Sequence, residues 1–453
     1  MFLPARLKKA YVHLPLKDVD GFLWQMQAKG FAHFFDVTDP FKLPELEPIT
    51  SKTAAVQDAL NQLPKPPVQD IFSEGLFGPK SHRIAFIQRQ PVEKLLKQVE
   101  QQPQGFSAVV LREQLQDALH AEQAKALAGA SAKTAVLGFW FDPKTDDLNW
   151  IKRDYDVYVE KPGEKDQPPT KLSNPPWLKA FELLTTGFRV PAYGEVDPTP
   201  AIALSFTLFF GFMFADAGYG LALLLLTLAG YFFTTKNNLV QKALNGILLY
   251  AALSTIAFGL YFGEFFGFSI NAEQAAAQDL TLLLYLSIAA GLAHLGISGA
   301  SQLFGKQKLY GLSLVGVIAG IAAYFWIPES LALSAAGILG LVYTKKWLFF
   351  KEILAIASGI ASYLRLGALA VVHLLIAQIL ANTLKAAAAQ PLGLVIAAVA
   401  FLVLGGLLLV FSVVLVFLQS LRLQWIEFLR FGPEDQGILF EPLAETDRHV
   451  HYT

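Results

Sequence analysis

The chain has 453 residues, of which 54% are hydrophobic and only 16% are charged, and its mean hydropathy is +0.42. Soluble proteins carry about 25% charged residues, so this composition excludes an ordinary soluble enzyme. The 36 Lys and Arg residues are balanced by 37 Asp and Glu residues, which excludes nucleic-acid binding driven by an excess of positive charge. The absence of cysteine excludes a disulfide framework, a thiol nucleophile and a Cys-based metal site.

The polar residues are concentrated at the start of the chain, since residues 201–453 hold only 12 Lys and Arg and 12 Asp and Glu. The first residues, MFLPARLKKAYVHLP, lack the apolar stretch of a signal peptide, so we expect this part to stay in the cytoplasm. Short β-branched or aromatic runs alternate with amphipathic stretches over residues 1–160, which predicts an α+β domain. The predicted strands are Lys9–Leu14, Phe31–Val37, Arg83–Gln88, Ser107–Leu111 and Thr134–Phe141, and the predicted helices are Asp18–Ala28, Ser51–Gln62, Pro91–Gln101 and Glu113–Ala128.

Three further regions follow. A Pro-rich connector over residues 161–196 should be extended. Residues 197–431 are predicted to be a membrane domain, and residues 432–453 a cytoplasmic tail. Crossing the hydrocarbon core of a bilayer takes about 20 apolar residues. The apolar runs of that kind are Ala201–Phe233, Ala243–Phe268, Leu280–Phe304, Leu309–Ile327, Leu331–Tyr343, Ile353–Leu384 and Leu392–Phe431.

The charges between these runs predict eight crossings rather than seven. Basic loops are expected on the cytoplasmic side. A cytoplasmic N-domain followed by one crossing from Ala201 to Phe233 would put every basic loop outside. We therefore read that run as two short helices that turn near Asp216, with one long tilted helix as the alternative. The basic loops carry Lys236, Lys242, Lys306, Lys308, Lys345, Lys346 and Lys351, and the acidic loops carry Glu273, Asp279 and Glu329.

Arg365 is the ionisable residue that a bilayer should tolerate least. It stands about 13 residues into the run Ile353–Leu384, about 20 Å along a helix, where a charge costs roughly 2.5–3.5 kcal/mol. Arg422 is about 8 residues from the end of the last run and has the alternative of snorkelling to the interface. Both runs exceed about 30 residues, which predicts long, tilted helices.

An arginine is a fixed cation that does not give up its proton, so Arg365 suits a partner carboxylate that releases and takes up protons as it passes. Glu352 and Glu427 sit near the ends of the last two helices. We therefore expect that the carboxylate partner of Arg365 lies on another polypeptide. The alternative is a structural arginine paired with a neighbouring helix.

For the other polar residues in the apolar runs, the sequence leaves two roles open. His373 lies eight residues after Arg365, about two helical turns, and is either part of a proton path or a neutral core histidine. His294, Asp216 and Glu264 either line water or satisfy backbone groups near loop ends.

Four stretches of the sequence resemble the membrane stator subunit of V-type and archaeal-type rotary ATPases, called subunit a or subunit I. The N-terminal stretch Arg6–Asp36 is a weaker match. The four stretches are FELL at residues 181–184 with YGEVDPTP at 193–200, FFGFMFADAGYG at 209–220, residues 362–369 with His373, and LRLQWIE at 421–427.

The resemblance implies an N-terminal cytoplasmic α+β domain and an all-α polytopic membrane domain of about eight helices, the last two long and tilted, with both termini cytoplasmic. Arg365 and Arg422 would face a rotating ring of proteolipid c-subunits and separate two aqueous half-channels. His373, Gln424, Asp216, Glu352 and Glu427 complete the ion-translocation residues expected here, with no catalytic residue, no cofactor and no metal.

The resemblance also implies the partners and the location. These are the proteolipid c-ring, peripheral stalk subunits bound by the N-terminal domain, the central stalk and catalytic head through the complex, and membrane lipid. The location is a prokaryotic cytoplasmic membrane. Such a subunit moves ions but catalyses no reaction by itself. H+ versus Na+, the direction of operation and the ring size stay open.

The sequence departs from the family pattern in four places, one of which is Ala215, where the usual residue beside Asp216 is Gly. Between Asp39 and Arg83 there is room for only one short helix, so the arm that contacts the stalks is shortened. Gln424 stands where eukaryotic members have His, and Ser412 stands where some members have a carboxylate. The remaining alternative is a stand-alone secondary transporter or channel, but the interrupted Gly211–Gly220 segment has no counterpart in the second half of the chain, as internal repeats would require.

Overall fold

The computed structural model describes residues 4–37, 47–48, 51–63, 85–87, 89–100, 106–130, 133–163, 166–233, 239–270, 280–304, 307–324, 327–388, 393–431, 436–444 and 450–452. The chain forms two compact units. One, the helical unit, comprises residues 172–234 and 238–436, and the other, the α+β unit, comprises residues 4–171 and 437–453. Lys236, Lys306, Glu273 and Asp279 of the charge argument lie outside the described residues.

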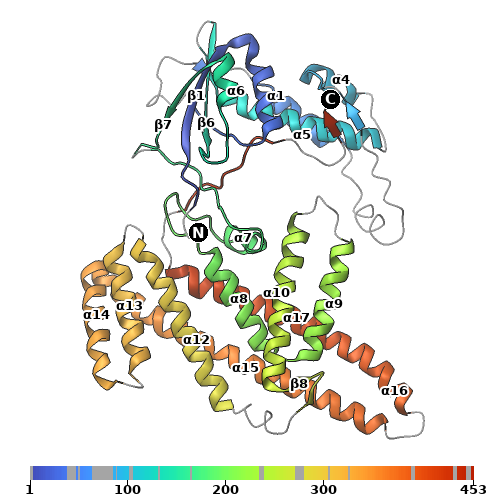
Figure 1. Cartoon of the computed structure of the whole chain (residues 1–453), viewed down its shortest axis with the longest axis vertical. Coiled ribbons are helices and arrows are strands. Elements are labelled where there is room, and N and C mark those ends of the chain that lie inside the picture. The colour runs from blue at the N-terminus through green and yellow to red at the C-terminus, as the bar shows by residue number, and fades with distance from the viewer. Residues whose placement is uncertain are drawn as a thin grey trace. The chain divides into compact units, whose positions relative to one another are not determined.

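The α+β unit contains a six-stranded sheet, in which the strands follow the order β3-β5-β6-β1-β7 and β2 also pairs with β6 (Figure 1), and a separate two-stranded sheet of β10 and β4. The central pair β1 and β6 is antiparallel, with Lys8 opposite Phe141 and Pro15 opposite Thr134. Inward residues of these strands and of helix α1 make one core, and helices α2, α4 and α5 make a second. The bounds are β1 Lys8–Pro15, α1 Val19–Lys29, β2 His33–Phe35, β3 Glu47–Pro48, α2 Thr53–Gln62, β4 Ala85–Ile87, α4 Val92–Glu100, α5 Phe106–Ala126, β5 Gly129–Ala130, β6 Thr134–Phe141, α6 Asn149–Asp154 and β7 Asp156–Glu160, preceded at α1 by the short 3-10 turn η1 Leu16–Asp18.

Most of the elements predicted for this unit are confirmed, and one is wrong. The strand predicted over Ser107–Leu111 is the first part of helix α5, because the apolar residues there continue into the helical pattern of the following segment rather than pairing with a strand. The strand β7 at Asp156–Glu160 was not predicted, since it has only five residues, is charged at both ends and is mostly exposed. The predicted strand at Arg83–Gln88 is described only at β4, Ala85–Ile87.

The residues after 436 belong to the α+β unit instead of forming a separate tail. The backbone of Thr170 donates to Ile438 (2.7 Å) and accepts from Phe440 (3.0 Å), and Leu443 donates to Ala32 (2.8 Å). At the end of the chain, β10 (Val450–Tyr452) pairs in parallel with β4. The last described residues of the chain are therefore part of the folded α+β unit.

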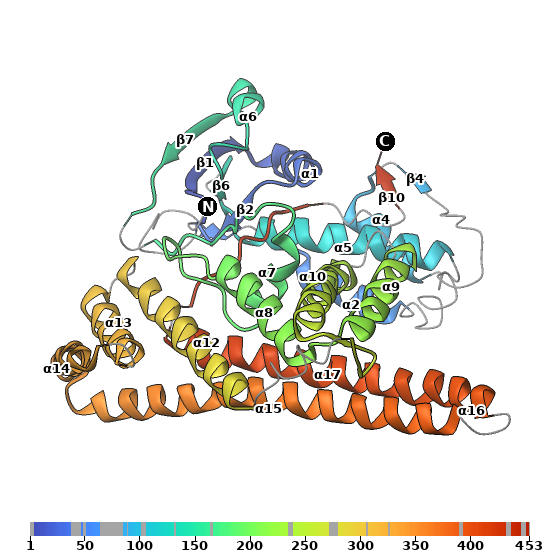
Figure 2. The same cartoon turned by 60° about the horizontal axis from the view of Figure 1, so that its bottom comes forward.

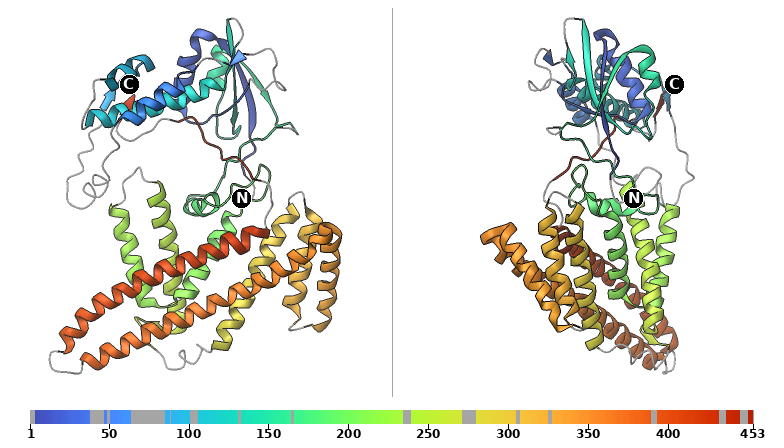
Figure 3. Two further views of the ribbon diagram at one scale, coloured as in Figure 1. Left: turned by 180° about the vertical axis from the view of Figure 1, so that it is seen from behind. Right: turned by 60° about the vertical axis from the view of Figure 1, so that its left-hand side comes forward.

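The helical unit consists mainly of helices (Figures 1 and 3). Among the described residues, four segments have the length and composition of a membrane crossing, namely 240–262, 281–304, 328–388 and 393–428, and shorter apolar helices cover 199–214, 217–231 and 308–323. The bounds are α7 Lys179–Thr186, α8 Thr199–Phe214, α9 Ala217–Phe233, α10 Leu239–Phe262, β8 Glu264–Phe265, β9 Phe268–Ser269, α12 Leu280–Ser301, η2 Gln302–Phe304, α13 Lys308–Ala323, η3 Pro328–Ser330, α14 Leu331–Lys345, η4 Lys346–Leu348, α15 Phe349–Ala388, α16 Gly393–Ala400, η5 Phe401–Gly405, α17 Gly406–Arg422, η6 Leu423–Phe428 and η7 Leu429–Phe431.

Two features of this unit matter for the site. The run Ala201–Phe233 is two helices, α8 and α9, as predicted, and α10 lies against both of them. The run Ala243–Phe268 is not helical to its end, because the residues after Phe262 form the small hairpin β8–β9. The longest helix, α15, lies alongside the chain of helical segments from α16 to η6, and the pair crosses the other helices obliquely (Figure 2).

Candidate functional site

The break between α8 and α9 is organised by Asp216. Its Oδ1 accepts hydrogen bonds from the backbone nitrogens of Gly218 (2.9 Å), Tyr219 (3.0 Å) and Phe266 (2.8 Å), and its Oδ2 accepts one from Gly267 (2.7 Å). The first two are the free N–H groups of a helix start, which a side-chain oxygen satisfies. The other two belong to the β8–β9 turn. Asp216 thus caps α9 and fastens the hairpin against it.

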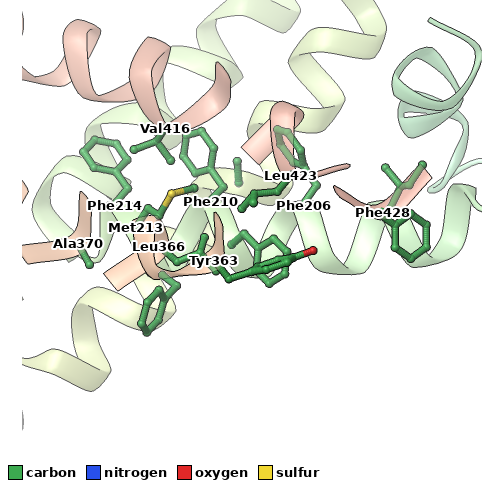
Figure 4. Close-up of a cluster of buried hydrophobic side chains, with 14 of the residues drawn as sticks. Phe206, Phe210, Met213, Phe214, Tyr363, Leu366, Ala370, Val416, Leu423 and Phe428 are labelled. Atoms are coloured by element: carbon green, nitrogen blue, oxygen red, sulfur yellow. The ribbon is translucent and has the colours of Figure 1, made fainter. Parts of the chain in front are cut away.

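An aromatic ridge on α8 positions the two long helices (Figure 4). Phe206, Phe210, Met213 and Phe214 of α8 pack into one buried cluster with residues of α15, α17 and η6. Since such clusters fill their space at crystal-like density, they set how α15 and α17 are rotated about their axes. The partners in Figure 4 are Tyr363, Leu366 and Ala370 of α15, Val416 of α17, and Leu423 and Phe428 of η6.

The polar residues on the other side of this contact converge on a pocket of about 330 Å³. Arg365 comes from α15, Arg422 from the end of α17, and Glu427 from η6. Arg430 of η7 completes the charged lining, so three cations and one carboxylate meet here. The remaining lining residues are Ala355, Ser358, Gly359, Ala361, Ser362 and Ile426.

Arg365 has an acidic partner within its own chain. Its Nη2 lies 3.4 Å from Oε1 of Glu427, and its Nε donates to the backbone oxygen of Ser362 at 3.1 Å. Nη2 also donates to the Ser362 hydroxyl, which in turn donates to Glu427. The premise that the last two helices of this chain supply no carboxylate to Arg365 is therefore wrong. Sequence position misled because Glu427 ends its helix yet lies opposite Arg365.

The π-helical segment η6 explains how Glu427 reaches the pocket. In an α-helix, residues five apart point about 140° away from each other. The wider π-helix, with hydrogen bonds from i to i+5, brings such residues closer to the same face, and these segments are frequent at functional sites. Arg422 and Glu427 are five apart and both line the pocket.

The other predicted residues on the last two helices lie outside this lining. His373 Nδ1 lies 3.0 Å from the Ser412 hydroxyl, so the serine that replaces a carboxylate has a histidine as its neighbour. Gln424 accepts a hydrogen bond from Ser205 of α8 at 3.1 Å. Both His373 Nε2 and Gln424 Nε2 are buried with no hydrogen-bond partner among the described residues. These are buried polar groups of the kind that water or an ion satisfies.

The remaining candidates have local tasks elsewhere in the unit. Glu352 accepts a hydrogen bond from Tyr310 of α13 at 2.9 Å, away from the pocket. Glu264, at the start of β8, accepts one from Gln378 of α15 at 3.0 Å. His294 lies 2.7 Å from the hydroxyl of Tyr363 and stacks on Phe428, with ring centroids 4.4 Å apart.

The structure adds three residues that sequence reasoning missed. Ser362 joins Arg365 to Glu427, Ser205 holds Gln424, and Tyr363 holds His294. Only Ser362 carried a signal, because it stands three residues before Arg365, one helical turn away. The other two contacts join helices far apart in the sequence.

Three polar side chains before α8, those of Asn174, Glu182 and Asp197, are linked by hydrogen bonds and form what we call the polar junction. The amide of Asn174 donates to Glu182 (3.0 Å) and to Asp197 (2.6 Å), and Asp197 accepts from the backbone of Thr199 (2.9 Å) at the start of α8. Burial raises the pKa of Glu182, and the Asp197 charge adds to this effect. Trp425 of η6 donates to the backbone oxygen of Leu184 at 2.8 Å, so the junction also braces the segment that carries Glu427.

Comparison with known proteins gives a family and several relatives. The model of the "V-type ATPase 116kDa subunit family" matches residues 147–276 and 352–444. The A-type ATP synthase subunit I of Archaeoglobus fulgidus is 46% identical over 124 residues, which are 26% of this chain and 18% of the relative. The subunits I of Pyrococcus horikoshii and Thermococcus kodakarensis are 29% and 30% identical, covering 64% and 62% of this chain and 49% and 48% of the relatives.

The matched residues include the polar junction, the α8–α9 break and both long helices with the charged pocket. The chain spans about half the length of the relatives from Pyrococcus and Thermococcus. The chain belongs to the V-type ATPase 116 kDa subunit family.

Proposed function

We propose that the chain is the membrane stator subunit of an archaeal-type rotary ATPase and that Arg365 and Arg422 mediate ion transfer to and from a rotating proteolipid ring. One observation carries the proposal: both arginines line the same pocket, between the two longest apolar helices. The relatives support it, since they are named A-type ATP synthase subunit I.

The chemistry of the pocket fits this role. A carboxylate of the ring that enters the pocket meets a guanidinium that stays charged, which favours release of its proton. Two aqueous half-channels would then supply and remove ions on either side of the arginines. His373 with Ser412 and Gln424 with Ser205 are the buried polar pairs that we assign to these paths, together with Glu427 at the pocket. Glu352 and Asp216 keep their local hydrogen bonds and have a secondary place in the proposal.

The membrane arrangement belongs to the same proposal. Eight crossings, with both termini in the cytoplasm of a prokaryotic cell, agree with the distribution of Lys and Arg between the apolar runs. The α+β unit would contact peripheral stalk subunits through its shortened arm. The central stalk and the catalytic head would be partners only through the assembled complex, and lipid would surround the remaining faces.

The central test is Arg365→Ala in the assembled complex. We expect this variant to abolish ATP-driven ion pumping into vesicles while the complex still assembles, because it removes the fixed cation that α15 contributes to the pocket. Arg422→Ala should impair pumping less, since Arg422 is the more exposed of the two. The measurement is the initial rate of acidification, or of ion uptake, per ATP hydrolysed.

Lys308→Ala is the matched control. Lys308 is an exposed cation at the start of α13 and does not line the pocket. This variant should pump like the parent. Pumping by Arg365→Ala at the rate of the parent would contradict the proposed function.

A further inference from the structure

Glu427 and Arg365 differ in burial. The side chain of Glu427 is 6% exposed, whereas that of Arg365 is 33% exposed. A buried carboxylate without a cation is costly, because it has lost its water and gains nothing in return. The carboxylate is thus the fixed member of the pair, and the guanidinium keeps one side open to the pocket.

The contact between the two groups is a single one. Only Nη2 of Arg365 approaches Glu427, at 3.4 Å from Oε1. Oε2 of Glu427 is buried and has no hydrogen-bond partner among the described residues. A bidentate pair, with two parallel N–H···O bonds, would be much stronger. The single contact holds the guanidinium in place but leaves it able to take a second carboxylate.

Ser362 stands between the two charges. Its hydroxyl accepts from Arg365 Nη2 and donates to Glu427 Oε1, which uses its one hydrogen and one of its lone pairs. Because Ser362 lies one turn before Arg365 on α15, it moves with the arginine rather than with η6. It therefore fixes the direction in which the guanidinium points.

We propose that Glu427 is the resting counter-ion of Arg365: acting with Ser362 as a positioning residue, it holds the guanidinium at the pocket between visits of the ring carboxylates. When a ring carboxylate arrives, Arg365 exchanges the single contact for the visitor, and it returns to Glu427 when the visitor leaves. A stationary competitor of this kind keeps the arginine from staying bound to one ring site. The inference rests on the proposed function for the identity of the incoming carboxylate, but the ion pair between Glu427 and Arg365 is independent of it.

The interaction of Glu427 and Ser362 with the Arg365 guanidinium is tested on the purified chain in detergent, without ring or nucleotide. Phenylglyoxal, an arginine-selective reagent, modifies accessible guanidinium groups, and mass spectrometry reports the rate at Arg365 relative to the exposed Arg153. Glu427→Gln and Ser362→Ala should each raise this relative rate about two- to fivefold, which corresponds to about 0.4–1 kcal/mol at 1.4 kcal/mol per factor of ten. Glu427→Asp, which restores the charge, should fall between Glu427→Gln and the parent.

The matched control is Glu329→Gln, which removes an exposed carboxylate of the same unit outside the pocket and should leave the rate at Arg365 unchanged. An unchanged rate in Glu427→Gln overturns the inference. If that variant does not fold, Ser362→Ala decides in the same way. The outcome is separate from the pumping of Arg365→Ala, so failure of this inference and failure of the proposed function are distinguished. In the assembled complex, Glu427→Asp should pump faster than Glu427→Gln, which a purely structural role would not require.

Discussion

The role of Asp216 depends on the backbone groups that surround its side chain in the folded unit. In the sequence it is a carboxylate between two apolar runs, and both a water-lined path and a backbone partner were open to it. In the structure its two oxygens accept four backbone hydrogen bonds. Hydrogen bonds to a charged acceptor are worth about 1.5–3 kcal/mol each, so this carboxylate stabilises the α8–α9 break.

At this scale we predict that Asp216→Asn destabilises the helical unit by about 2 kcal/mol or more. An amide has one accepting oxygen, and its NH2 group would face backbone donors on the other side. The measurement is the midpoint temperature of unfolding of the purified chain in detergent. Glu329→Gln, an equal change of charge at an exposed site, is the control. Unfolding of Asp216→Asn at the temperature of the parent would show that the cap contributes little.

For Arg365, the sequence indicates the position of the charge but not its partner. Its position deep in an apolar run could be read directly from the sequence, and so could its suitability as a fixed cation. Its partner could not, because the pair Arg365 and Glu427 is separated by 62 residues and depends on the π-helical turn of η6. A regular helix would have directed Glu427 elsewhere.

The distance between α10 and the start of α9 is short enough to require a glycine at the contact. At Gly259 of α10, an added Cβ would overlap the backbone nitrogen of Ala217 at the start of α9. Backbone atoms of a capped helix start do not yield as a flexible side chain does. Glycine at this position is therefore required by the distance between the two helices.

We predict that Gly259→Ala destabilises the helical unit by about 1–3 kcal/mol, the usual cost of inserting an atom into a packed contact. Gly406→Ala is the control at the start of α17, where an added Cβ meets no atom within 4 Å. That variant should be as stable as the parent or up to about 1 kcal/mol more stable, because alanine favours the helix. The midpoint temperatures of unfolding in detergent compare the two. Equal midpoints for the two variants would contradict the packing argument.

The elements that sequence patterns missed share a physical cause. Ser107–Leu111 has the composition of a strand, but its backbone groups are satisfied within α5. β7 is short and mostly exposed, but it pairs with β1, with Lys9 opposite Glu160 and His13 opposite Asp156. In both places the context of the segment, a continuing helix or a neighbouring strand, outweighs the preference of its own residues.

At the scale of the whole molecule, the proposed topology makes a clear prediction. The natural chain has no cysteine, so single cysteines report the side of the membrane without a background. A membrane-impermeant maleimide applied from outside should label Cys at Glu329, between α13 and α14, and should not label Cys at Trp347, between α14 and α15. Both positions are exposed, Trp347 at 84%.

A single crossing from Ala201 to Phe233 would give the opposite pattern, because it inverts every later loop. Labelling of Trp347→Cys from outside, with Glu329→Cys protected, would therefore contradict eight crossings with a cytoplasmic start. The parent chain, which offers no thiol, is the control for reaction with other groups.

The path of the chain after the last helix also belongs to this scale. A tail after residue 431 was expected, but residues 437–444 and 450–452 are part of the α+β unit. The hydrogen bonds of Thr170 and Ala32 to this segment join residues more than 250 positions apart. No local sequence pattern after residue 436 predicts that this segment bonds to such distant residues.

The sequence by itself determined the apolar helices, the interruption at Asp216, the mid-helix arginine and the resemblance to rotary ATPase stator subunits. These follow from composition, period and motif, which are local properties of a chain and act before any packing. Only the tertiary structure decided that Glu427 faces Arg365, that Asp216 is a cap and that the end of the chain pairs with β4. Those contacts depend on how helices are rotated and how distant segments meet, and packing and hydrogen-bond satisfaction over the folded unit set both.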